Sequence, residues 1–430
     1  MNEDRGARRI IKKIGDSHVV WFPESNRWIE FREPAWFVYR QLQKGEEERT
    51  IINLLIKRYD LPENEACRFL REIMEGIKIS ARTSFKQEQD TTLILEEASG
   101  NAGRTKTRHY LINSKYFTIS YGTPELEHYI HRPFAWLETG SNPGNSLHIE
   151  IFSEQHGRKD KQADDTAVPG KKYILCLEGK AQHVFDDAGF LKHKLYVIIT
   201  SHIYGIPEER WMSYIHASGV TNGREAILLS SASGSGKSTM AAMLQLPVDN
   251  PGHSRPLPDN PQEKFLPQNR LFFMSDDFVP VDSLTLRAHP FPAALTIKKG
   301  SYPAISSFYN AQKDADAEYG RFRNPDIRYI IPCLPPDKGY EPREVKKIIF
   351  IRYNPRIDFF MEKLPAINAL SLFHEEAWVS HNPGHAQRFI DWFVTLECYK
   401  IEYSDNKKTI EAIRGLFEKN NQSAEKKTGL

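Results

Sequence analysis

The sequence has little net charge and few cysteines. Its 58 Lys and Arg residues nearly balance 56 Asp and Glu residues, so the charge gives no reason to expect nucleic acid or an anionic membrane as a partner. The four cysteines are scattered without a metal-site or redox spacing, which fits a reducing cytoplasm. No apolar run approaches the roughly 20 residues that span a bilayer, and the first residues have no apolar region typical of a secretory signal. We therefore expect a cytoplasmic protein.

The length of 430 residues allows two or three domains, each with its own core. Apolar residues make up 40% of the chain and charged residues 27%, as in ordinary globular proteins. The expected fold class is α/β (α+β). The expected divisions are a winged-helix-like module over 1–80, a linker over 81–108, a β-rich segment over 109–215, an α/β domain over 216–418 and a disordered tail over 419–430.

The first 80 residues combine a hairpin signal with three helix signals. HVVWF and RWIEF flank the turn PESN and predict a β-hairpin. Pro34 suits the first turn of a helix over PAWFVYRQLQ, and Gly45 ends it. EEERTIINLLIKRY predicts a second helix. The third follows from apolar residues at three- and four-residue steps, namely Ala66, Phe69, Leu70, Ile73, Met74 and Ile77.

The middle of the chain alternates short apolar stretches with polar loops. HYLI, YFTISY, SLHIEIF, KYILCLE and KLYVIIT predict strands, and TLILEE predicts one strand inside the linker. From His216 the order becomes strand, loop, helix, as an α/β unit requires. The proline-rich stretch 246–270 predicts an excursion from the core, and helices are expected over HAQRFIDWFVTLECYK and KKTIEAIRGLFEK.

The stretch AILLSSASGSGKSTMAAML predicts a buried strand, a Gly/Ser loop and a helix. Backbone N–H groups of such a loop and the helix N-terminus converge on one anion site. Gly234 and Gly236 allow the backbone conformations and the close approach that a side chain would block. Lys237 can bridge two phosphates, and the Ser238 hydroxyl can ligate Mg²⁺. The pattern predicts a nucleotide site rather than a Gly/Ser connection with an incidental lysine.

One position departs from the phosphate-loop formula G-x-x-x-x-G-K-[ST], because Ser231 stands where the first glycine is expected. Its N–H can still face a phosphate. If this position needed a positive φ, a serine there would cost about 1–2 kcal/mol.

A second candidate strand, RLFFMSDDFVPV, ends in Asp276 and Asp277. Adjacent carboxylates near one metal can divide two tasks. One coordinates Mg²⁺, and the other accepts the proton of an attacking hydroxyl. A solvated turn with two acids is the alternative reading.

Two further positions are weaker candidates. His216 precedes the loop strand and is either catalytic or a histidine of a core or hairpin. Lys298 and Lys299 follow an apolar strand and are either a second clamp on phosphate charge or a solvated pair.

Taken together, IHASGV, ILLSSASGSGKST, FMSDDFVPV and AALTIKKG resemble the HPr kinase/phosphorylase-like proteins, which share a fold with ATP-dependent phosphoenolpyruvate carboxykinase. VKKIIFIRYNP and FVTLECYKIEYSD resemble this family's later strand and closing helix–strand. The resemblance covers roughly residues 205–418. The gap between Lys237 and Asp276 is longer than usual in that family, and the family's phosphorylase signature has no clear match here.

The resemblance implies roles for individual residues. Asp277 would be the general base, Asp276 and Ser238 would hold Mg²⁺, and His216 would be the family's histidine before the loop. ATP would be bound by the loop residues and one later lysine, namely Ser233, Gly234, Ser235, Gly236, Lys237, Ser238, Thr239 and Lys298. Related kinases often assemble, so a homo-oligomer is an expectation as well.

The first 80 residues resemble PqqD, a small module that holds leader peptides in ribosomally made peptide pathways. Such a module binds an extended peptide at an exposed strand edge beside a helix. The corresponding places here are Trp28–Phe31 and the outer face of the helix over Glu63–Ile77. A DNA-binding winged helix is the alternative, but acidic and basic residues nearly balance in this segment and no basic stripe marks the third helix.

These resemblances predict an ATP-dependent kinase that phosphorylates Ser or Thr of a peptide or small protein. The expected substrate is a ribosomally made precursor held by residues 1–80. Two alternatives remain open. One is a kinase for a small metabolite such as free serine, and the other is a nucleotide-dependent protein that presents a peptide without phosphorylating it.

Overall fold

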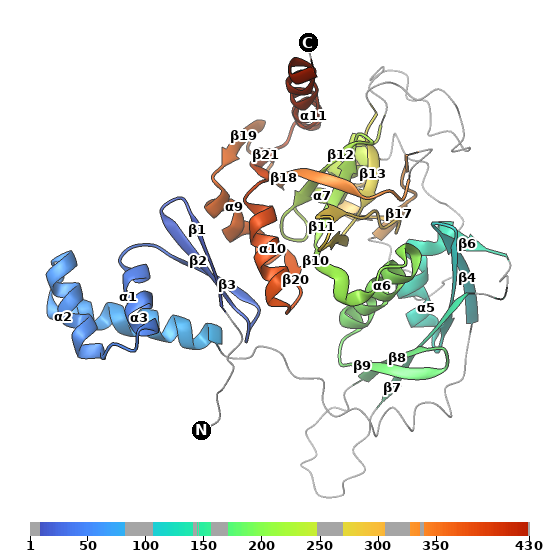
Figure 1. Cartoon of the computed structure of the whole chain (residues 1–430). Helices are drawn as coiled ribbons and strands as arrows, with labels where there is room; N and C mark the ends of the chain where they lie inside the picture. Colours follow the sequence, from blue (N-terminus) through green and yellow to red (C-terminus); the bar gives the residue numbers. More distant parts are fainter. Residues whose placement is uncertain are drawn as a thin grey trace, which may run out of the picture.

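The computed structural model describes residues 9–81, 106–140, 144, 146–155, 171–246, 270–305, 327–335 and 339–428. It is a mixed α/β protein with several sheets (Figure 1). The predicted strand in TLILEE and nearly all of the proline-rich excursion lie outside the described residues. None of the described helices is both long and apolar enough to cross a membrane.

The N-terminal module is a three-stranded sheet followed by three helices. The hairpin and all three predicted helices are confirmed, and one more strand, β1, precedes them. The elements are β1 (Ile10–Ile14), β2 (Ser17–Phe22), β3 (Arg27–Phe31), α1 (Ala35–Gln43), α2 (Glu48–Tyr59) and α3 (Glu63–Ala81). The six apolar residues predicted on one face of α3 are buried or half-buried, so this helix is amphipathic as its spacing indicates.

A six-stranded sheet with two α-helices forms the middle of the chain. Its strand order is β6-β4-β5-β7-β8-β9. The elements are β4 (Lys106–Ile112), β5 (Lys115–Tyr121), α5 (Pro124–His131), the 3-10 helix η1 (Arg132–Leu137), β6 (Glu138–Thr139), β7 (Leu147–Gln155), β8 (Lys171–Leu177), β9 (Lys180–Phe185) and α6 (Ala188–Tyr204).

The helix α6 corrects one prediction, because KLYVIIT is helical and not a strand. Its β-branched residues favour a strand locally. The helix is nevertheless fixed at both ends: Asp187 accepts hydrogen bonds from the N–H groups of Gly189 and Phe190, and Gly205 ends the helix at φ 61°. Most of its apolar side chains are buried between the six-stranded sheet and residues such as Phe278 and Phe291, so tertiary packing overrides local propensity.

The catalytic candidates lie on a ten-stranded sheet. Its main path runs β13-β11-β12-β18-β15-β14-β10-β20, and β21 lies between β18 and β19. The strands are β10 (Trp211–Ile215), β11 (Ala217–Thr221), β12 (Glu225–Ser230), β13 (Phe272–Ser275), β14 (Val279–Asp282), β15 (Arg287–Ala288), β18 (Arg343–Tyr353), β19 (Phe359–Leu364), β20 (Ala377–Val379) and β21 (Glu397–Tyr403). Strand β10, expected in the middle segment, therefore pairs within this sheet.

The remaining elements surround this sheet. They are the 3-10 helix η2 (Glu208–Arg210), α7 (Lys237–Leu244), the pair β16 (Leu295–Lys298) and β17 (Ile327–Ile330), the 3-10 helix η3 (Lys299–Ser301), α8 (Tyr302–Ile305), α9 (Ala366–Phe373), α10 (Pro383–Phe393) and α11 (Asn406–Thr428). Two predictions are corrected here. The helix expected through Lys400 ends at Phe393, and β21 follows. Helix α11 continues to Thr428, through most of the expected disordered tail, because no glycine or proline interrupts it after Gly415.

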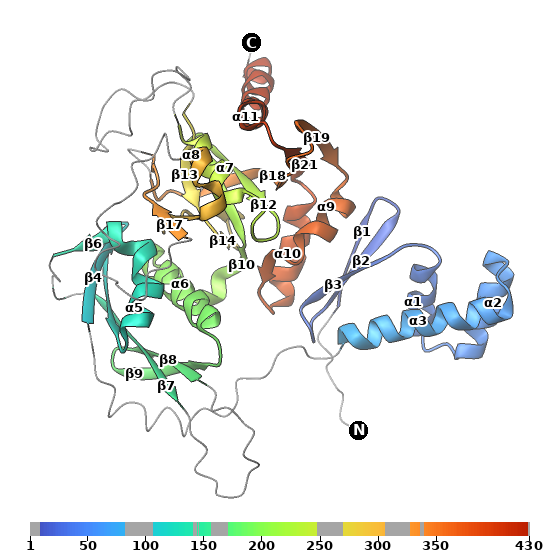
Figure 2. The ribbon, with the colours of Figure 1, turned by 180° about the vertical axis from the view of Figure 1, so that it is seen from behind.

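The N-terminal sheet packs directly on the α10 side of the unit that contains the ten-stranded sheet (Figures 1 and 2). Ile10, Ile14, Val19 and Trp21 belong to the same buried cluster as residues of β10, β14 and α10. Trp28 packs against Phe389 of α10, with ring centroids 6.3 Å apart. The module and the unit that contains the ten-stranded sheet therefore share a hydrophobic core.

Candidate active site

The predicted phosphate loop joins β12 to α7, as its sequence indicates. Strand β12 pairs in parallel with β18, so the loop leaves the carboxyl end of a buried parallel strand. Gly234 has φ 88° and Gly236 has φ 103°, conformations that favour glycine. A Cβ atom at position 236 would lie 2.8 Å from the Tyr403 hydroxyl oxygen, so this glycine is also required for space. The loop thus has the glycine conformations predicted for it and ends at a helix N-terminus, a place that favours anions in proteins.

Ser231 fits this loop without strain. The described non-glycine residues with positive φ do not include it. Its carbonyl accepts a hydrogen bond from the Lys237 ammonium, which also lies 3.4 Å from the Ala232 carbonyl oxygen. The departure from the usual first glycine therefore imposes no left-handed backbone here.

Asp276 connects the Asp pair to the phosphate loop. Its Oδ1 accepts hydrogen bonds from the hydroxyls of Ser238, at 2.9 Å, and Ser218, at 2.5 Å. The Thr296 N–H donates to its Oδ2 at 3.0 Å. The pairing of β11 with β13 sets Gly219 opposite Ser275, which brings Ser218 beside Asp276. The two motifs predicted to form one site therefore meet in space.

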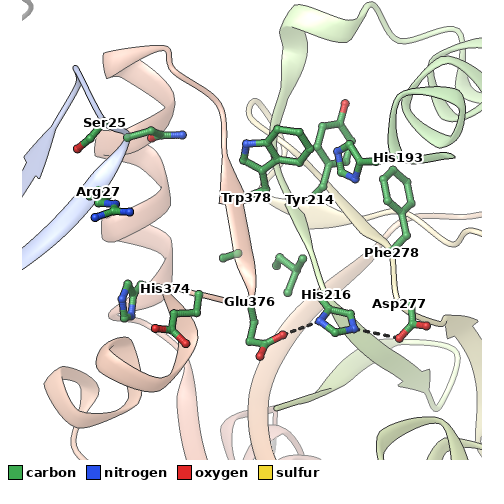
Figure 3. A pocket seen from close by; sticks show the side chains of 14 residues that line it. Ser25, Arg27, His193, Tyr214, His216, Asp277, Phe278, His374, Glu376 and Trp378 are labelled. Atoms are coloured by element: carbon green, nitrogen blue, oxygen red, sulfur yellow. Dashed lines mark hydrogen bonds and ion pairs between the residues drawn. The ribbon is translucent and has the colours of Figure 1, made fainter. Parts of the chain in front are cut away.

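Asp277 points the other way. It has φ 59°, a left-handed conformation in which Asp is more common than most residues. This turn sends the Asp276 side chain inward and leaves half of the Asp277 side chain exposed. The Asp277 Oδ1 lies 3.2 Å from His216 Nε2 (Figure 3). One carboxylate is thus buried toward the loop, and its neighbour is open to a substrate.

His216 lies between two carboxylates. The ring Nδ1 of His216 is 2.6 Å from Glu376 Oε2, and the backbone N–H of His216 donates to the Glu376 backbone carbonyl oxygen at 2.7 Å. Sheet register explains this arrangement: β10 pairs with β14 and with β20, so Ile215 lies opposite both Val279 and Ala377. The sequence pattern did not indicate Glu376, which lies 160 residues after His216 and belongs to no motif.

Neighbouring charges, hydrogen bonds and burial shift the pKa values of His216, Asp276 and Asp277 in different directions. Hydrogen bonds to Asp277 and Glu376 raise the pKa of His216 to about 9, so the ring is protonated at neutral pH. Burial and the neighbouring Asp277 raise the pKa of Asp276 to about 7. Desolvation opposes ionisation of Asp277, but the hydrogen bond and charge of His216, followed by Lys237 and Lys192, lower its pKa. Adjacent carboxylates with opposite shifts are typical of groups with different catalytic tasks.

The other predicted residues lie around the loop. The Lys298 ammonium donates to Ser233 Oγ at 2.8 Å, which brings this lysine onto the loop. The Ser235 carbonyl accepts a hydrogen bond from the Tyr353 N–H, and Thr239 lies in the first turn of α7. Lys192 of α6, which the sequence did not indicate, contributes positive charge near both Asp residues.

The donor set fits a magnesium ion. Ser238 and Asp276 offer two oxygen atoms 2.9 Å apart, and the buried carboxylate, whose pKa is raised, would be stabilised by a cation. Mg²⁺ prefers oxygen ligands and usually takes few from the protein, completing its shell with phosphates and water. The described residues contain no group of three or more His, Cys, Asp or Glu side chains that could hold a metal ion by themselves.

No protein-family model matches this sequence, and no curated protein matches it either.

Proposed function

We propose that this protein is an ATP-dependent kinase that transfers the γ-phosphoryl group to a Ser or Thr hydroxyl of a peptide or small protein. The observation that supports it most is the contact between Ser238 and Asp276, with Asp277 exposed beside them. This combines a phosphate-binding loop, oxygen ligands for Mg²⁺ and a proton acceptor within one site. The HPr kinase-like pattern in the sequence supports the same assignment.

In the proposed reaction the substrate hydroxyl oxygen bonds to the γ-phosphorus while the bond from that phosphorus to the β,γ-bridging oxygen breaks, releasing ADP. The hydroxyl proton goes to Asp277. The loop N–H groups and Lys237 would neutralise phosphate charge, and Ser238 and Asp276 would hold Mg²⁺, which supplies further charge neutralisation when bound. His216, protonated between Asp277 and Glu376, orients the Asp277 carboxylate.

The expected substrate is a ribosomally made precursor peptide. The PqqD-like pattern of residues 1–80 motivates this part of the proposal, and β3 is an edge strand of the described N-terminal sheet. A peptide added at that edge would lie near the catalytic domain, and a short tether raises effective concentration to about the millimolar range.

The alternative of a protein that only presents a peptide was motivated by Ser231. Since that residue does not have a positive φ, its backbone conformation gives this alternative no support, and the gain of a phosphate by the peptide distinguishes the two functions.

Transfer from γ-labelled ATP tests the proposal. The purified chain is incubated with Mg²⁺, ATP and short precursor peptides that contain Ser or Thr, with free serine as a parallel acceptor. We expect labelled peptide, and no label when Lys237→Ala replaces the wild type. Labelled free serine with unlabelled peptides would contradict the peptide assignment, and equal transfer by Lys237→Ala would contradict the site.

A further inference from the structure

A cavity of about 360 Å³ opens beside His216 and Asp277. This volume lies in the range of about 300–1,000 Å³ that is typical of sites for small ligands or side chains. Its lining comes from two parts of the chain. His216 and Asp277 lie in connections between strands of the ten-stranded sheet. Ser25 and Asn26 belong to the turn between β2 and β3 of the N-terminal module, and Arg27 is the first residue of β3 (Figure 3).

Hydrogen bonds fix this turn against the catalytic domain. The Asn26 side chain donates to the Val379 carbonyl oxygen at 2.5 Å and accepts from the Trp21 ring N–H at 2.8 Å. The Ser25 hydroxyl donates to the Ser80 carbonyl at the end of α3. Strand β20, which ends at Val379, also carries Trp378 of the cavity and follows Glu376 directly. The turn therefore forms one wall of the cavity and is held in place by these hydrogen bonds.

Charged groups of both signs line the cavity: Arg27 and the protonated His216 are positive, and Asp277, Glu375 and Glu376 are carboxylates. Arg27 is the only Lys or Arg among its described lining residues, and its exposed guanidinium makes no hydrogen bond or ion pair with the described residues. His193 also lines the cavity, but burial lowers its pKa to about 4, so it is neutral. Arg27 and Asp277 lie on opposite sides of the cavity (Figure 3). A ligand with a hydroxyl at one end and an anionic group at the other could contact both residues.

An aromatic surface covers a further side of the cavity. Trp378 is 39% exposed, and its ring lies 4.1 Å from that of His193. Tyr214 and Phe278 stack beside them with ring centroids 5.1 Å apart. Large exposed rings in a cavity favour apolar or aromatic side chains of a ligand.

We propose that this cavity is the acceptor subsite and that it selects an acidic peptide segment. The Ser or Thr hydroxyl faces Asp277, an apolar or aromatic neighbour packs on Trp378, and an Asp or Glu carboxylate of the peptide binds Arg27. This inference rests on the proposed kinase function and adds to it a substrate class. It also makes the N-terminal module part of the catalytic cavity, in addition to its proposed role in peptide capture.

Binding of labelled peptides tests the inference without requiring catalysis. The probes are blocked, fluorescein-labelled heptapeptides with a central Ser-Phe pair, in which one Asp is moved through the remaining positions. Each has a twin with Asn in place of Asp. Fluorescence anisotropy measures the dissociation constant with Mg²⁺ and a non-hydrolysable ATP analogue. We expect at least one Asp peptide to bind about tenfold more tightly than its Asn twin, because a charged hydrogen bond to Arg27 is lost in the twin.

Two substitutions of exposed residues, one that removes a positive charge and one that removes a negative charge, should change binding of the Asp peptide in opposite directions. Arg27→Gln should remove the preference for Asp over Asn, and Glu375→Gln, which removes an exposed negative charge from the same cavity, should strengthen binding of the Asp peptide. Trp378→Ala should weaken binding of every Ser-Phe peptide several-fold. Nucleotide affinity and the thermal midpoint, measured for each variant, check that the fold is intact.

The outcomes separate this inference from the proposed function. If no Asp peptide binds more tightly than its twin, or if Arg27→Gln retains the preference, the acceptor subsite is refuted even where phosphate transfer occurs. If the preference is present and depends on Arg27, but no peptide gains phosphate from ATP, the subsite stands and the kinase assignment fails.

Discussion

At the scale of single residues, Asp276 and Asp277 share a backbone turn but not an environment. The first is buried under Ser218, Ser238 and the Thr296 N–H, and the second is half exposed against His216. The dipeptide could be found from sequence because it follows an apolar strand. The division of tasks depends on φ 59° at Asp277 and on the sheet register.

Asp277→Asn should remove the proton acceptor and leave the nucleotide site in place. We expect the single-turnover rate of phosphate transfer to fall by about 100-fold or more, since general base catalysis typically contributes 10²–10⁴. The dissociation constant for ATP should change by less than about twofold. A rate close to that of the wild type would assign the proton transfer to another group.

Asp276→Asn should stabilise the free protein in a pH-dependent manner. The pKa of Asp276 is about 7 in the folded chain, above its ordinary value of 3.8, so the folded state binds this proton more tightly. The stability it contributes is present below the ordinary value and is lost as pH rises toward about 7. In the absence of Mg²⁺, the thermal midpoint of Asp276→Asn should therefore exceed that of the wild type by more at pH 8 than at pH 5. A difference independent of pH would contradict a buried, strained carboxylate.

At the scale of elements, local signals predicted the loop and its flanking strand and helix because the glycines, the lysine and the apolar strand are contiguous. The same kind of reasoning failed for α6, whose β-branched stretch is helical owing to its caps and its burial. It also missed β1, because the sequence IIKKI does not alternate regularly between apolar and polar residues. This segment is a strand because it pairs with β2. Glu376 could not be found, because only the pairing of β10 with β20 brings it to His216.

Gly236→Ala and Ser231→Gly form a matched pair in the phosphate loop. Alanine at 236 would be strained at φ 103°, with its Cβ 2.8 Å from the Tyr403 hydroxyl, so ATP binding should weaken by at least about tenfold. Glycine at 231 restores the common loop formula, yet the backbone there requires no positive φ, so ATP affinity should stay within about threefold. Titration calorimetry measures both. If Ser231→Gly bound ATP more tightly than the wild type by much more than this factor, the serine would be shown to disturb the loop.

At the scale of the whole molecule, the N-terminal sheet shares a buried cluster with the unit that contains the ten-stranded sheet. The sequence predicted the module and the nucleotide-binding unit separately, but it held no signal for their contact. That contact depends on side chains from distant parts of the chain, such as Trp28 on β3 and Phe389 on α10.

The shared core predicts that the N-terminal module and the unit that contains the ten-stranded sheet unfold together. Trp21 is fully buried in this cluster, and replacing a buried Trp with Ala typically costs about 3–5 kcal/mol. Trp21→Ala should therefore lower the midpoint temperature of the main calorimetric unfolding transition of the full chain. This transition should be the same one that nucleotide stabilises. Loss of a small separate transition, with the nucleotide-stabilised one unchanged, would mean that the module folds independently.

We propose that Ser238 and Asp276 join the phosphate loop to the Asp pair in one magnesium–nucleotide site. Calorimetric titration of ATP into the wild type and into Asp276→Asn, each with and without Mg²⁺, is the experiment that tests this claim. We predict that Mg²⁺ tightens ATP binding by about tenfold or more in the wild type and much less in Asp276→Asn. An equal effect of Mg²⁺ on both proteins, or no ATP binding by the wild type, would contradict the claim.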